Sequence, residues 1–165
     1  MTCAKDTRHL MMRANRLLGP ALVERDLVSV DELERATGRL LELTARGEPR
    51  ECTLLGVLAH ELKVVSEAEV LRRSVEADGI GLVELRALEV PEELRKEFDP
   101  AECWATWTVP FDREAGITCL ATAYHLSPAV RAHWEKRAGG TVLWYGTTLG
   151  DIAEHLARFA SSGAA

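Results

Sequence analysis

The sequence predicts an α+β fold, in which a helical subdomain of two helix-turn-helix repeats precedes a small β-sheet with packed helices. One observation is a pattern that occurs twice, with matching residues 37 positions apart, as for Gly19 and Gly56 or Ser29 and Ser66. The other is a change of period after Gly79, where short alternating runs and helical runs follow in the order β-α-β-β-α-β-α. We therefore expect a partly disordered lead-in over 1–14, the repeated helical subdomain over 15–78, an α/β subdomain over 79–160 and a disordered tail over 161–165.

The first repeat is expected over residues 16–41. Apolar residues recur at helical spacing over 17–23, and the apolar turn that follows ends at Val28. Ser29 and Glu32 then form an S-x-x-E capping box, in which each side chain can satisfy a backbone N–H group of the other residue at the start of a helix. The repeat therefore consists of a helix, a tight turn and a capped helix.

The second repeat is expected over residues 53–78 and follows the same plan. Leu54-Leu55-Gly56 opens its first helix, and Val64-Val65 stands at the turn. Ser66 and Glu69 form a second capping box. Because these residues keep one common offset from the first repeat, we interpret both segments as copies of one unit.

Beyond Gly79, short runs of β-branched and apolar residues alternate with helical patterns that begin at Pro or Ser. The predicted elements, in chain order, are a strand at 82–85, a helix at 91–98, a helical turn from 99, a hairpin formed by 108–111 and 117–123, a helix from Ser127 to Arg137, a strand at 141–145 and a helix at 149–159.

The composition excludes several classes of protein. Apolar residues make up 47% and charged residues 28% of the 165 residues, which is typical of a folded globular chain. The net charge of −6 argues against binding to a nucleic-acid polymer or to an anionic membrane, since both need a cationic face. The sequence has no apolar run long enough for direct membrane insertion, and its four scattered cysteines favour reduced thiols. We expect a cytoplasmic protein.

The sequence offers no catalytic motif. It lacks the G-x-x-x-x-G-K-[ST] phosphate loop, the H-E-x-x-H zinc motif and the G-x-S-x-G nucleophile motif. Cys103, Cys119, His125 and His133 have no finger-like spacing, so no metal site is expected. We predict a protein that is not an enzyme and has neither catalytic residues nor a cofactor.

The doubled unit and the second half together resemble the N-terminal domain of the type II secretion and type IV pilus assembly ATPases, the MshEN type. That family repeats the pattern R-L-G-x-x-L-V-x-x-G-L-I twice. The first copy is matched at Leu18, Gly19, Leu22, Val23, Leu27, Val28, Leu33 and Ala36, and the second more loosely at Leu55, Gly56, Val64, Val65 and Val70. The resemblance covers residues 16–160 and implies the same α+β fold.

In some members the doubled repeat is similar to a receptor for cyclic di-GMP, and the resemblance implies a set of candidate nucleotide-binding residues. These are Arg16, Leu18, Gly19, Leu22, Val23, Leu55 and Gly56. Most polar positions of the family pattern are changed: its Arg is Leu17 and Leu54, its later Gly is Asp26 and Lys63, and its final Gln is Leu40 and Ala77. Arg16 stands one residue out of register. Gly19 and Gly56 have two possible roles: they can let a ligand approach the backbone, or they can let two helices pack closely.

The resemblance implies a regulatory or adaptor module that docks onto a protein partner in a bacterial secretion, pilus or motility machine. A cyclic di-GMP receptor with a degenerate motif is the alternative. The four tryptophans, Trp104, Trp107, Trp134 and Trp144, can form a stacking platform for a base or pack the sheet against its helices, and we favour packing.

Overall fold

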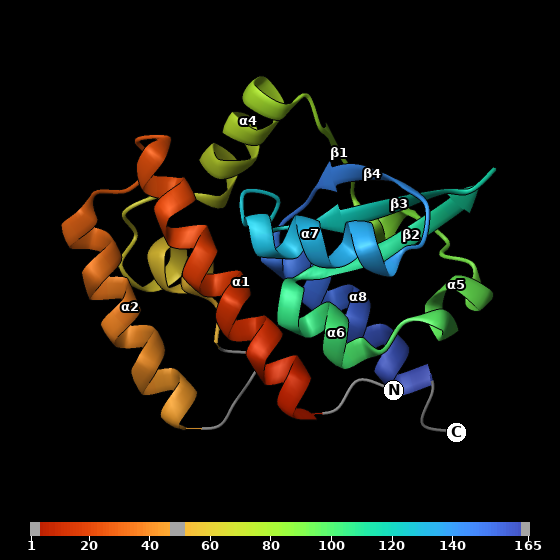
Figure 1. Ribbon diagram of the computed structural model, residues 1–165, viewed down its shortest axis with the longest axis horizontal. Coiled ribbons are helices and arrows are strands. Elements are labelled where there is room, and N and C mark those ends of the chain that lie inside the picture. Colours follow the sequence, from red (N-terminus) through yellow and green to blue (C-terminus); the bar gives the residue numbers. More distant parts are fainter. Residues whose placement is uncertain (1–3, 47–51, 163–165) are drawn as a thin grey trace.

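The computed structural model describes residues 4–46 and 52–162. The helices are α1 (Ala4–Glu24), α2 (Val30–Ala45), α3 (Leu54–Gly56), α4 (Glu67–Asp78), α5 (Glu92–Glu97), α6 (Pro100–Thr106), α7 (Pro128–Arg137) and α8 (Leu149–Ser162). The strands are β1 (Gly81–Leu82), β2 (Thr108–Glu114), β3 (Ile117–Thr122) and β4 (Thr141–Gly146). Figure 1 shows α1 and α2 side by side at one end and the sheet at the other, which confirms the predicted α+β fold.

The repeat has the predicted helix-turn-helix form in both copies. Ser29 caps α2 with a complete capping box, since Glu32 N–H donates to its hydroxyl (3.1 Å) and its own N–H donates to Glu32 Oε1 (2.8 Å). Ser66 caps α4 by accepting from Glu69 N–H (3.1 Å), but the predicted second capping box is only half formed, because the Glu69 carboxylate pairs with Arg72 (2.9 Å). The copies differ in the first helix, because α3 continues as a π-helical segment, Val57–Glu61, whereas α1 is a regular α-helix.

The sheet has the strand order β1-β4-β3-β2. Strands β2 and β3 form the predicted antiparallel hairpin, and β4 lies parallel to both β3 and β1. The predicted strand over 82–85 is shorter than expected, because Leu85 is fully buried and begins a 3-10 turn. Its N–H donates to Asp151 Oδ2 of α8 (2.7 Å) instead of to a neighbouring strand.

The structure corrects the prediction of a partly disordered lead-in over 1–14. From Ala4 onwards, the described part of this segment forms the first half of α1. Met11 and Ala14 are buried because α1 packs against α6 and α7. The tail prediction is likewise too long, since α8 continues to Ser162, and residues 163–165 lie outside the described part.

One hydrophobic core runs through both predicted subdomains. A buried polar contact joins them as well: Tyr124, which follows β3, donates its hydroxyl to Asn15 Oδ1 on α1 (2.7 Å). Asn15 Nδ2 donates to the carbonyl of Cys52 (3.0 Å), just before α3. Helix α1 therefore connects the second repeat to the sheet.

Candidate functional site: the groove between α1 and α2

The structure divides the candidate nucleotide-binding residues between the core and the surface. Leu18 and Leu22 have no exposed surface and Leu55 is 1% exposed, so these three side chains face protein on all sides. Val23 is half-buried and packs against the same core. Of these candidates, Arg16 is exposed, and Arg16, Gly19 and Gly56 line hollows of the surface.

The two glycines lie in different hollows. Gly19 lies with Arg16 and Leu40 in a groove between α1 and α2, which we call the α1–α2 groove. Gly56 lies in a second hollow together with Arg39 and His60. The structure therefore brings together residues near both ends of the first repeat, and it separates them from the glycine of the second.

Both glycines are needed for packing. A Cβ atom at Gly19 would lie 2.7 Å from Leu33 Cδ1 of α2, so the glycine lets the two helices approach closely. A Cβ atom at Gly56 would lie 2.6 Å from Thr53 Cγ2, and the Thr53 hydroxyl accepts from Gly56 N–H (3.2 Å) to cap α3. Neither glycine requires a ligand to explain it.

The α1–α2 groove has a volume of about 360 Å³ and predominantly apolar walls. Its lining side chains come from α1, α2 and the start of α3: Met11, Met12, Asn15, Arg16, Pro20, Leu33, Thr37, Leu40, Leu41, Thr44 and Leu54. Met12 is 52% exposed and Leu41 is 65% exposed, so two large apolar side chains face solvent at the two edges of the groove. An apolar hollow with an exposed apolar edge is typical of a docking surface.

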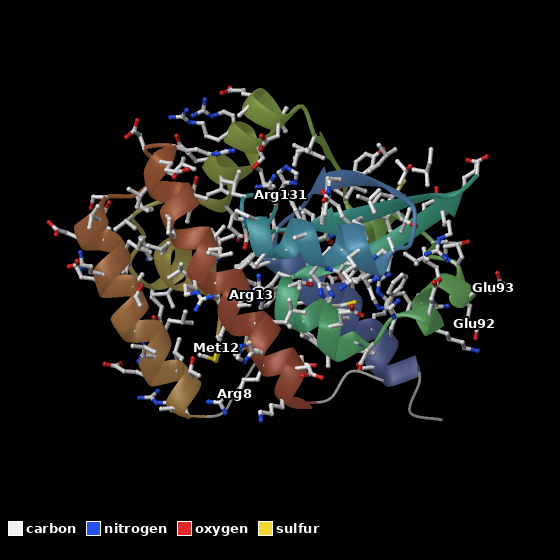
Figure 2. All side chains as sticks on the ribbon, viewed as in Figure 1. Arg8, Met12, Arg13, Glu92, Glu93 and Arg131 are labelled. Atoms are coloured by element: carbon white, nitrogen blue, oxygen red, sulfur yellow. The ribbon has the colours of Figure 1, made fainter. Side chains whose placement is uncertain are left out.

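The α1 side of this groove carries positive charge. Arg16 lines it, and Figure 2 shows Arg8 beside Met12 on the side of α1 that faces α2. Both arginines are exposed, and neither has a carboxylate partner within the described residues. Since the whole chain has a net charge of −6, this is a local reversal of sign.

The second hollow has a volume of about 560 Å³, but its main cation is already paired. Arg39 Nε and Nη2 donate to the two carboxylate oxygens of Glu61 (3.0 and 3.1 Å), and Nη1 donates to Glu42 (3.0 Å). These hydrogen bonds raise the pKa of Arg39 and lower that of Glu61. The Arg39 guanidinium is therefore already bound by two carboxylates, and an incoming anion would have to compete with them.

No catalytic cluster stands in either hollow. Within residues 4–46 and 52–162, no group of three His, Cys, Asp or Glu side chains could hold a metal ion. Burial raises the pKa of the Cys103 thiol, and burial together with Asp112 raises that of Cys119, so neither is an activated thiolate. None of the helices in the described part of the chain combines the length and apolar character that crossing a membrane requires.

The four tryptophans pack in or against the hydrophobic core, which is the interpretation that we favoured over a stacking platform. Trp134 is fully buried on α7, with its Nε1–H donated to the hydroxyl of Thr106 on α6 (3.0 Å), and Trp107 is 5% exposed. Trp104 and Trp144 are half-buried against the core.

The sequence interpretation missed Met11 and Met12 of the α1–α2 groove. Met11, Ala14, Leu18 and Leu22 share a helical spacing, and this spacing would have extended α1 toward the N-terminus.

Comparison with known proteins identifies the fold. No family model and no curated protein matches the chain. Solved structures do: the N-terminal domain of XpsE matches in two crystal forms, with TM-scores of 0.56 and 0.58, 22% and 21% identity, and coverage of 84% and 88% of this chain and 91% and 94% of theirs. The chain has the fold of the XpsE N-terminal domain.

A structure of MshE with cdg, which is cyclic di-GMP, also matches, with a TM-score of 0.53 and 17% identity. The match covers 86% of this chain and 97% of that one. The predicted resemblance to the MshEN type is thus confirmed at the level of the fold.

Proposed function

We propose that this chain is a non-catalytic regulatory or adaptor module that acts by docking a protein partner in the α1–α2 groove. The observation that carries the proposal is the exposed apolar edge formed by Met12 and Leu41 over an apolar groove. Leaving these side chains in water is unfavourable, and covering the exposed half or more of each would contribute about 1–2 kcal/mol. A partner that supplies an apolar surface would gain that free energy.

The groove also indicates what the partner should look like. An amphipathic helix could lay its apolar face between α1 and α2, as helices do in apolar grooves. Arg8 and Arg16 stand on the α1 side, so acidic residues beside that apolar face would be attracted and steered into place. The shared fold with the XpsE N-terminal domain favours a partner from a bacterial secretion, pilus or motility machine.

The test is position-specific photo-crosslinking in cells that produce the protein. A crosslinking residue at Leu41 should give one discrete adduct of defined mass, and Arg16→Glu in the same chain should reduce its yield. Leu143 on β4 is the matched control, because it is also an exposed leucine (46%) but lies far from the groove. Equal adducts at both positions, or none at Leu41, would contradict docking in the groove.

A cyclic di-GMP receptor is the second candidate function, and one observation favours it. Arg16 and Gly19 share the α1–α2 groove, so a guanine base could stack on the guanidinium while the glycine admits it closely. MshE, which has a similar fold, has been solved with cdg. Leu40 and Leu54 also line this groove, however, and neither can donate or accept a hydrogen bond to a base edge.

A further inference from the structure

A separate cavity lies at the opposite end of the molecule from the α1–α2 groove, where α5, α6 and α8 meet β2 (Figure 1). Its volume is about 220 Å³, enough for a small organic molecule. The walls are mainly apolar and include Phe98, Val109, Leu156 and Phe159. Such a space suits a ligand with an apolar body rather than a highly hydrated one.

Arg95 of α5 forms no ion pair with the described residues of this cavity, although its charge acts on Glu92, which also lines the cavity. Lys96 also lines the cavity, but its ammonium is paired with Glu92 Oε1 (2.8 Å). The Arg95 guanidinium instead lies over the Phe159 ring, 4.2 Å from its centre, and has no carboxylate partner among residues 4–46 and 52–162. Its Nε atom is buried without a hydrogen-bond partner.

His155 of α8 is the second polar group of the cavity that lacks a partner. The residue is only 3% exposed, it stacks edge-on against Phe159, and its Nδ1 atom is buried with no hydrogen bond. Burial, helped by the nearby Arg158 and Arg95, lowers the pKa of His155 to about 4, and Asp151 opposes the shift. The imidazole is therefore neutral at pH 7.

Buried nitrogen atoms without partners are rare in folded proteins and call for an explanation. Arg95 and His155 come from different helices, both line one apolar cavity, and each has a buried nitrogen atom without a hydrogen-bond partner. We propose that this cavity binds a small monocarboxylate with an apolar body, whose carboxylate is held by Arg95 and His155 and whose body packs against Phe98 and Phe159.

The net charge of the cavity favours a carboxylate over a phosphate as the bound group. With Lys96 paired to Glu92 and a neutral imidazole, the cavity offers one net positive charge, which matches a monoanion. A planar guanidinium binds a carboxylate through two parallel hydrogen bonds. This site is separate from the α1–α2 groove, so it holds or fails independently of the proposed function.

The experiment measures hexanoate binding to the purified full chain by isothermal titration and by ligand-observed NMR, with hexanol as the neutral counterpart of the same length. We expect hexanoate to bind with a Kd of about 1 mM or below and hexanol at least about tenfold more weakly, since the charged contact is worth a factor of ten or more. Arg95→Met should weaken hexanoate binding by about tenfold.

Arg158→Met is the matched control. Arg158 also stands near the Phe159 ring, with its guanidinium 6.0 Å from the ring centre, but it does not line the cavity. This substitution removes the same charge and should leave hexanoate affinity within about twofold. If Arg95→Met does not fold, Ala160→Trp at the cavity lining provides the second variant and should abolish binding by filling the space.

Three outcomes would overturn the proposal. The first is no detectable binding of hexanoate at about 10 mM, a concentration at which even a weak ligand is detected. The second is equal binding of hexanoate and hexanol. The third is an equal loss of hexanoate affinity in Arg95→Met and Arg158→Met. The last two would show an apolar cavity or a general charge effect instead of a carboxylate site.

Discussion

Asp26 and Lys63 take the same left-handed backbone conformation at equivalent positions of the two repeats, with φ angles of 57° and 54°. After α1, Asp26 N–H donates to the carbonyl of Val23 (3.0 Å) and Leu27 N–H donates to that of Leu22 (3.0 Å), the pair of bonds that closes a helix in a Schellman motif. The family pattern has glycine at this place. The position therefore serves backbone geometry, and in this chain two residues with side chains adopt it at an energetic cost.

Lys63→Gly should stabilise the protein. A left-handed conformation costs a residue with a side chain about 1–2 kcal/mol, and the greater freedom of glycine in the unfolded chain offsets roughly half of that. We expect the free energy of unfolding to rise by about 0.5–1 kcal/mol, and by less for Asp26→Gly, because aspartate tolerates this conformation better. Urea denaturation measures both. A loss of stability in Lys63→Gly would contradict the argument, and Gly79→Ala, where φ is 67°, should lower stability as the reverse control.

Tyr124→Phe should destabilise the protein as a whole. The Tyr124 hydroxyl is buried, donates to Asn15 Oδ1 (2.7 Å) and lies 2.6 Å from the Thr53 hydroxyl. Removing it takes one hydrogen bond each from Asn15 and Thr53 and takes the acceptor from Leu55 N–H (3.4 Å), at a cost of about 1–3 kcal/mol. Chemical denaturation should show this loss in a single transition. Tyr145→Phe, at a half-buried tyrosine of β4, is the control and should change stability by less than about 0.5 kcal/mol.

Cyclic di-GMP at tens of micromolar should neither raise the melting temperature nor release measurable heat. A buried base edge that faces Leu40 loses a hydrogen bond that it makes in water, and each such loss costs about 1–3 kcal/mol. Two or three losses weaken a micromolar ligand to roughly millimolar. Tight binding that disappears in Arg16→Ala would contradict this prediction and promote the receptor as the function.

The purified protein should hydrolyse no ATP above background. The sequence has no phosphate loop, so it lacks the backbone cradle and the lysine that hold the β- and γ-phosphates in such ATPases. A phosphate-release assay on repurified protein measures this directly. Turnover that persists through a second purification and is lost on mutating this chain would overturn the non-catalytic assignment.

Stability should fall as the pH is lowered from about 6.5 toward 4. The pKa of His155 is about 4 in the folded protein, whereas an unfolded histidine titrates near pH 6.5. Between these values the unfolded chain binds the additional proton, so the free energy of unfolding decreases by an amount on the order of 2 kcal/mol. Burial lowers the pKa of His125 as well, in the same direction. Urea titrations at several pH values should show this slope, and His155→Gln should flatten it; a slope unchanged in that variant would refute the assignment to His155.

The sequence predicted the parts of the fold that depend on local signals. Ser29 and Ser66 cap their helices because a serine hydroxyl three residues before a backbone N–H satisfies it whatever the tertiary structure. The first half of α1 was missed because its apolar residues are sparse. The spacing of Met11, Ala14, Leu18 and Leu22 carries the signal, but it extends over several helical turns and no short motif marks it.

The candidate site was predictable only in part. Its position between the helices of the first repeat follows from Gly19, which must pack against α2. The helical spacing of Leu18 and Leu22 fits a core position, as their burial shows, but that spacing alone does not exclude a ligand contact by the same residues. The unpaired Arg95 and His155 gave no signal at all, since they are 60 residues apart in sequence and meet only when α5 and α8 pack on β2.

Helix α1 bears the groove on one side and packs on α6 and α7 on the other, with Asn15 bonded to both Tyr124 and the start of α3. The sequence suggests a boundary near Gly79, but cutting the chain there would expose the hydrophobic core that both halves share. Neither half should therefore be portable by itself. A protein engineer who wishes to graft this module onto another chain must transplant residues 4–162 as one block.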